Sequence, residues 1–164
     1  MPPTSGPTTS VTQLAADAAT LRRSLRAVDC KDPDALAERI TAAQDAATRA
    51  LSLYLQHQRR STGPSGARVH AVDRLAQAAK CAQDATAALT CALARHAENQ
   101  RRGTESGPVI HIGPSPWQHV HAAADLLQRI PALCNEADHW LATPKGDHHA
   151  PATPASQPAV TRTR

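Results

Sequence analysis

Apolar residues recur at steps of three and four along most of this chain, which is the spacing of one buried face of an α-helix. The first such stripe follows Ser10, and Gln13 stands three residues later as in an S-x-x-Q capping box. The stripe consists of Leu14, Ala18, Leu21, Leu25 and Val28. This pattern predicts a helix over residues 11–30.

A second helix is predicted over residues 33–60. Asp32 can accept a hydrogen bond from the first helical turn, and Pro33 suits the first helical position because its fixed φ is already helical. Its apolar stripe is Leu36, Ile40, Ala43, Ala47, Leu51 and Tyr54.

Two further helices are predicted over residues 67–102 and 116–142. Gly103 ends the third helix, and the pair Ser115 and Gln118 forms a second capping box at the start of the fourth. The third stripe is Val72, Leu75, Ala79, Ala82, Thr86, Leu89 and Leu93, and the fourth is Trp117, Val120, Ala124, Leu127, Cys134 and Leu141.

These elements predict an all-α fold, an up-down-up-down antiparallel four-helix bundle within residues 10–143. Short connections favour antiparallel neighbours, and the near-heptad spacing favours shallow crossing angles. Residues 1–9 and 144–164 are rich in Pro, Thr, Ser and Ala and poor in bulky apolar groups. Such segments cannot bury enough surface to offset the entropy of ordering, so we expect two disordered tails.

The predicted core is thin. Hydrophobic residues make up 41% of the 164 residues, yet there is no Phe, one Tyr and two Trp. Because alanine buries little apolar area, the helices must approach closely. A homodimer can form through the Ala-rich helix faces or through the segment 109–112.

Several classes of function are disfavoured by the composition. No apolar run approaches the roughly 20 residues that cross a bilayer, and no secretory signal stands at the N-terminus, so we expect a cytoplasmic protein without membrane contact. The four cysteines, Cys30, Cys81, Cys91 and Cys134, show no C-x-x-C spacing. We expect reduced structural thiols.

The candidate polar pairs do not converge on a catalytic or metal site. Glu136 and His139 form a lone E-x-x-H, whereas a di-iron bundle needs two such motifs and two further carboxylates. Cys91 and His96 stand five apart, so they point about 140° apart on a helix and cannot act as a nucleophile and its base. The sequence therefore predicts no enzyme activity, no metal and no cofactor.

A basic cluster gives one candidate for nucleic-acid binding. Arg22, Arg23 and Arg26 lie in the segment LRRSLR, and the net charge of +4 includes a basic C-terminal tail. Arg22 and Arg26 repel each other at i, i+4 unless an anion lies between them. These three side chains are the candidate phosphate contacts, although a solvated surface is the interpretation we favour.

The most strand-like stretch, GPVIHIGPSPW, lies in the last connection. Val109, Ile110 and Ile112 favour extended backbone, and the Gly-Pro pairs on both sides exclude them from either helix. One interpretation, which we favour, is a plug that covers one end of the bundle beside Trp117. The other is an exposed edge that pairs with a partner or a second copy. Val109, Ile110, His111, Ile112 and Trp117 form the candidate interaction segment.

The sequence thus favours a non-enzymatic helical protein-interaction or accessory module whose protein partner is unknown and that can form a homodimer. The alternative is a nucleic-acid-associated accessory protein that uses the arginine cluster and the basic tail.

Overall fold

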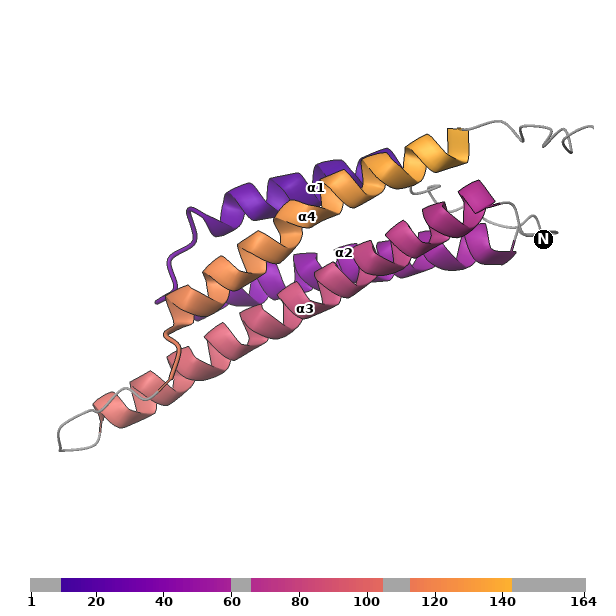
Figure 1. Ribbon diagram of the computed structural model, residues 1–164. Coiled ribbons are helices and arrows are strands. Elements are labelled where there is room, and N and C mark those ends of the chain that lie inside the picture. The colour runs from indigo at the N-terminus through magenta and orange to yellow at the C-terminus, as the bar shows by residue number, and fades with distance from the viewer. Residues whose placement is uncertain (1–9, 60–65, 105–112, 143–164) are drawn as a thin grey trace, which may run out of the picture.

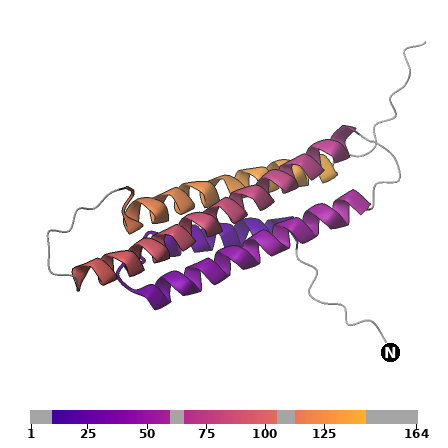
Figure 2. The ribbon, with the colours of Figure 1, turned by 90° about the horizontal axis from the view of Figure 1, so that it is seen from below.

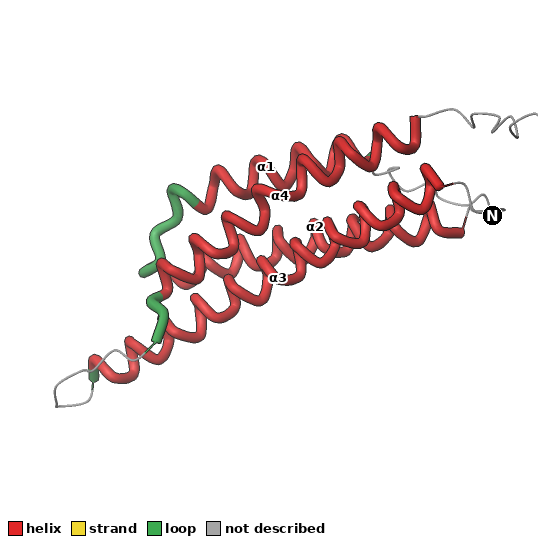
Figure 3. Tube along the Cα trace, viewed as in Figure 1, coloured by secondary structure: helices red, strands yellow, loops and turns green. Residues whose placement is uncertain are grey.

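The computed structural model describes residues 10–59, 66–104 and 113–142, and these form four helices and no strand (Figures 1 and 3). They are α1 (Val11–Leu25), α2 (Pro33–Arg59), α3 (Gly66–Gly103) and α4 (Pro116–Ala142). The predicted all-α class and the four-helix count are confirmed for this part of the chain. The two predicted tails and the segment Val109–Ile112 lie outside the described residues.

Side chains predicted to cap the helices do so at three N-termini. Ser10 Oγ accepts a hydrogen bond from the backbone N–H of Gln13, and Asp32 Oδ1 accepts from Asp34 and Ala35. Only the box at α4 is reciprocal: Gln118 N–H donates to Ser115 Oγ while Ser115 N–H donates to Gln118 Oε1. Each cap satisfies backbone donors that have no partner within the helix.

α1 ends at Leu25, so the predicted end at residue 30 is wrong. After Leu25 the backbone N–H groups of Arg26, Ala27 and Val28 donate to carbonyls three residues back, which tightens the chain into turns. Asp29 then accepts a hydrogen bond from the backbone N–H of Lys31 through its side chain. A short acidic side chain competes in this way with the helical ladder, and the connection 26–32 results (Figure 3).

The four helices lie side by side, and each packs on two neighbours (Figures 1 and 2). α3 contacts α4 and α2, and α1 contacts α4 and, least extensively, α2. No contact joins α1 with α3 or α2 with α4. One side of α2 is therefore covered by no other described helix, and α2 forms one edge of the molecule in Figure 2.

Alanine supplies half of the buried apolar positions among the described residues, and leucine supplies most of the remainder. The largest fully buried side chains include Leu14, Leu36, Leu75, Leu89 and Leu127. Two positions that the stripes assigned to the core are instead exposed, Leu51 at 42% and Trp117 at 46%. Leu51 lies at the edge of its stripe, and the neighbouring turns bury Ala50 and Leu53 instead.

Polar and aromatic contacts join the helices around the core. Thr12 and Arg22 of α1 donate hydrogen bonds to Asp138 and Gln128 of α4, respectively. On α3, Arg74 forms an ion pair with Glu136 of α4, with Nε 2.7 Å from Oε2. One turn earlier, the ring of His70 lies 4.9 Å from the ring of Trp140.

Gly113 leads the chain into α4 in a conformation that only glycine adopts readily. Its φ is +92°, and a Cβ atom added there would lie 2.8 Å from Arg95 Nη2 of α3. The backbone conformation therefore favours glycine at this position, whereas the guanidinium is the end of a flexible side chain and can move away.

Across the described ranges, no helix combines the length and the hydropathy that a membrane span requires.

Candidate interaction surface

The exposed side of α2 carries a heptad repeat of uncharged residues. The positions follow alternating steps of four and three, and all are exposed: Ala37, Thr41, Gln44, Thr48, Leu51, Leu55 and Gln58. Such spacing keeps side chains in line along a helix and is typical of a seam that packs on another helix. We call this set the outer seam of α2. Its two leucines, Leu51 and Leu55, are 42% and 38% exposed.

The hydroxyl groups of this side are turned to their own helix. Thr41 Oγ1 donates to the carbonyl of Ala37, and Thr48 Oγ1 donates to the carbonyl of Gln44. Ser52, beside the seam, donates in the same way to the carbonyl of Thr48. These bonds use the hydroxyl donors within α2. The outer seam consequently presents less hydrogen-bonding capacity to solvent than its composition suggests.

The outward side of α4 differs from this seam. α4 exposes Asp125, Arg129, Glu136 and His139, so its solvent side is charged, as is normal for an amphipathic helix. On α2 the charged side chains nearest the seam are displaced to its flank and its ends. Exposed apolar groups in line, without charge between them, are a feature of interaction surfaces.

The two ends of the outer seam carry opposite charges. Asp34 lies in the first turn of α2 and Arg59 is its last residue, and both side chains are exposed. Each complements the helix dipole at its own end. Arg59, Leu55, Ser52 and Gln56 line an open hollow of about 430 Å³ beside the seam.

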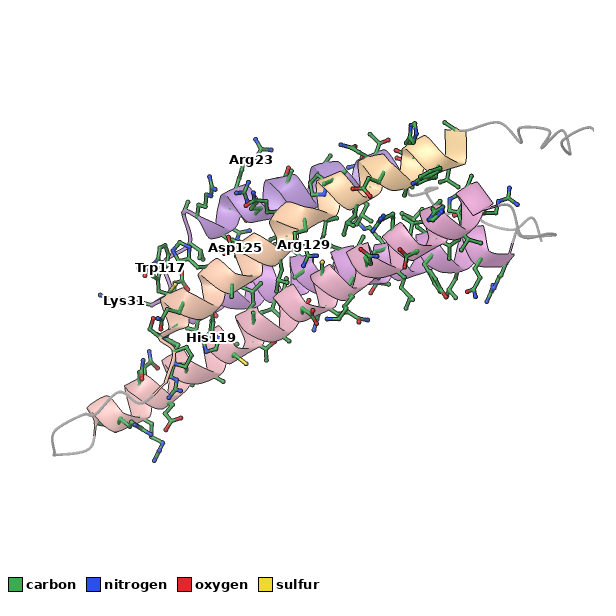
Figure 4. The ribbon with its side chains drawn as sticks, viewed as in Figure 1. Arg23, Lys31, Trp117, His119, Asp125 and Arg129 are labelled. Carbon is green, nitrogen blue, oxygen red and sulfur yellow. The ribbon has the colours of Figure 1, made fainter. Side chains whose placement is uncertain are left out.

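The predicted phosphate contacts do not form one free cluster. Arg22 is partly buried: its Nη2 donates to Gln128 Oε1 at 2.7 Å, and its Nε is inaccessible to solvent without a partner. Arg23 Nη2 donates to Thr20 Oγ1 at 3.1 Å, and its side chain projects from α1 into solvent (Figure 4). Arg26 is exposed just beyond the end of α1. Two exposed arginines therefore remain for an anion.

Of the candidate interaction segment, Val109, Ile110, His111 and Ile112 lie outside the described residues, and the structure places Trp117 alone. Trp117 lies in the first turn of α4 (Figure 4), and its ring meets His121 edge to face with centroids 4.2 Å apart. His121 lies on the same exposed side of α4. Trp117 is available to contact a partner.

A second, smaller hollow lies between α1 and α2. Its volume is about 300 Å³, and Asp17, Thr20 and Ser24 of α1 line it together with Arg39, Asp45 and Arg49 of α2. An ion pair between Arg49 and Asp17 spans the two helices. Arg39 Nε is inaccessible and unpaired. The lining charges balance, so this hollow favours neither anions nor cations.

The cysteines and histidines were the remaining candidates for chemistry. Cys91 is exposed whereas His96 is buried, so the two side chains lie on different sides of α3. Burial, together with Asp138, raises the pKa of Cys134 to about 12, and burial and Asp29 raise the pKa of Cys30. Within the described ranges no three His, Cys, Asp or Glu residues lie close enough together to hold a metal ion.

The outer seam was not predicted from the sequence, because Leu51 also fits the inward-facing stripe of its helix. The signal was nevertheless present as an uncharged 4-3 repeat from Ala37 to Gln58, interleaved with the buried stripe. Comparison with protein-family models, curated proteins and solved structures gives no match for this chain. Among the described residues, the fold defines an all-α protein of four helices whose α2 exposes two leucines within an uncharged seam.

Proposed function

We propose that this protein is a non-enzymatic helical protein-interaction or accessory module of the cytoplasm, and that the outer seam of α2 is its binding surface. The observation that carries the proposal is the uncharged heptad with Leu51 and Leu55 exposed on a side that no other described helix covers. Burying Leu51 and Leu55 against a partner helix removes their apolar surface from water.

The up-down-up-down antiparallel order is part of this proposal. It is supported by pairs of contacts: Thr12 with Asp138 and Arg22 with Gln128. As residue numbers rise along α1 they fall along the contacted turns of α4. The contacts of His70 with Trp140 and of Arg74 with Glu136 support the same relation between α3 and α4. In this order α2 and α3 form an antiparallel hairpin. The outer seam of α2 faces away from the other described helices and can receive a partner helix.

The test uses the full chain as bait for proteins from its own cells, followed by purification of the captured protein and measurement of its binding. Leu51→Asp with Leu55→Asp is the test variant, because burying two carboxylates in an apolar contact is unfavourable. Ala122→Asp with Ala132→Asp, on the exposed side of α4, is the matched control. The proposal expects binding to be lost in the test variant alone. Equal binding by both variants would contradict it.

The second candidate function is association with nucleic acid through the arginine cluster and the basic tail. It is supported by the exposed side chains of Arg23 and Arg26 and by the net charge of +4. Arg22, held by Gln128, weakens this candidate. The tail lies outside the described residues.

A further inference from the structure

We propose that the partner of the outer seam is a second copy of this chain, with α2 packed antiparallel on α2 about a two-fold axis. This inference rests on the proposed function and specifies the partner of the same surface. A two-fold contact requires one surface to be complementary to itself. The charge and the side-chain size at one end of the seam must therefore complement those at the other end. The two ends of α2 meet this requirement in charge, and the seam positions meet it in size.

Charge complementarity selects the antiparallel direction. Asp34 and Arg59 mark opposite ends of α2 and are exposed. Neither forms an ion pair with another described residue. Antiparallel packing brings Asp34 of each copy to the level of Arg59 of the other, which gives two ion pairs of opposite charge. Parallel packing would bring Asp34 to Asp34 and Arg59 to Arg59, and like charges at an interface are unfavourable.

Side-chain size matches in the same register. When the axis passes midway between Gln44 and Thr48, the exposed Leu55 of one copy faces Ala37 of the other, and Leu51 faces Thr41. A large residue opposite a small one allows the side chains of two helices to interdigitate. Gln44 and Thr48 then meet across the axis, and a polar pair at the centre of a helical seam fixes its register.

The hollow beside the seam lies where the first turns of the second copy's α2 would pack. Ser52, Leu55, Gln56 and Arg59 line it at the C-terminal half of α2. In the antiparallel register the first turns of the other copy's α2, from Asp34 to Ala37, pass over this half. The small side chain of Ala37 enters beside Leu55, and the carboxylate of Asp34 comes within reach of the Arg59 guanidinium.

The experiment is a charge exchange measured by sedimentation equilibrium of the full chain at low salt. Asp34→Arg alone and Arg59→Asp alone each place like charges at both ends of the contact, and we expect the dimer Kd to rise about tenfold or more. The double variant, with both substitutions, restores opposite charges and is expected to return the Kd to within about threefold of the wild type. Arg23→Asp, on α1, is the matched control and should leave the Kd unchanged.

The double variant also separates association from folding. Both substitutions oppose the dipole of α2, so the double variant has the least stable helix of the set. Recovery of the dimer in that variant cannot therefore come from improved folding. A wild type that remains monomeric would overturn the pairing with a second copy. It would not overturn the proposed binding of another protein, which the Leu51→Asp, Leu55→Asp variant tests separately. A dimer whose Kd is insensitive to the single substitutions, or is not restored in the double variant, would overturn the antiparallel α2 contact.

Discussion

Arg22 of α1 and Gln128 of α4 are joined by a hydrogen bond of 2.7 Å from Nη2 to Oε1. The two residues come from helices far apart in sequence, so the guanidinium acts as a bridge between helices. An arginine that looked like part of a surface anion site is thereby assigned to the packing of α1 on α4. Its stem also covers part of the contact, because the side chain is half-buried.

Arg22→Ala is therefore expected to lower the free energy of unfolding by about 1 kcal/mol, the scale of one hydrogen bond to a charged donor together with lost packing. Arg23→Ala, which removes an exposed side chain bonded only within its own helix, should change it by less than about 0.5 kcal/mol. Urea unfolding followed by circular dichroism compares the two variants. Equal effects would contradict the bridging role of Arg22.

The nucleic-acid candidate gives a separate expectation. With Arg22 engaged, a variant in which only Arg23 and Arg26 are changed to Ala should abolish any binding through this cluster. Fluorescence anisotropy with a labelled duplex at rising salt measures it, since phosphate contacts weaken steeply as counterions compete. Binding that falls with salt and is lost in this variant would favour the second candidate function. Binding that is absent, or insensitive to both changes, removes it.

Gly113→Ala is expected to destabilise the protein by about 1–2 kcal/mol. The substitution must accommodate a φ of +92° and a Cβ atom 2.8 Å from Arg95 Nη2. Gly66→Ala is the matched control, because no atom lies within 4 Å of the Cβ position there and its φ is not positive. Thermal unfolding of both variants measures the difference in stability between them. Equal stability of the Gly113→Ala and Gly66→Ala proteins would contradict the requirement for glycine at the start of α4.

The thiols are expected to react in an order set by exposure and pKa. The thiolate is the reactive form, and the raised pKa of Cys134 leaves about one thiolate in ten thousand molecules at pH 8. Cys91 is exposed and should react fastest with iodoacetamide. Cys30, with its raised pKa and partial burial, should react more slowly than Cys91. Peptide mass spectrometry after timed labelling gives each rate, and unfolding in urea should remove the differences.

Much of the fold could be predicted from local chemistry. The helix starts were predictable because Ser10, Asp32 and Ser115 carry side-chain acceptors next to apolar stripes, and their bonds are present. The end of α1 could not be predicted, because Val28 continues the apolar stripe beyond it. The competing hydrogen bond, from the Lys31 backbone N–H to the Asp29 side chain, forms only once the chain has turned.

The candidate surface was harder to predict for a physical reason. A heptad and the 3.6-residue period nearly coincide over a few turns, so Leu51 fits both a buried stripe and an exposed one. Only the packing of α1 and α3 on α2 decides which side Leu51 occupies. The segment around Ile110, which the sequence made the leading candidate, lies outside the described residues, so its two interpretations stay predictions.

The central claim, that the outer seam of α2 is an interaction surface used by a second copy, is tested most directly by the molar mass of the full chain in solution. Sedimentation equilibrium from micromolar to near-millimolar protein should show the wild type rising from 17.3 kDa toward twice that mass. The variant with Leu51→Asp and Leu55→Asp should stay at the monomer mass with unchanged helix content, and the Ala122→Asp, Ala132→Asp control should follow the wild type. A wild type of 17.3 kDa at every concentration, or a dimer that persists in the leucine variant, would contradict the claim.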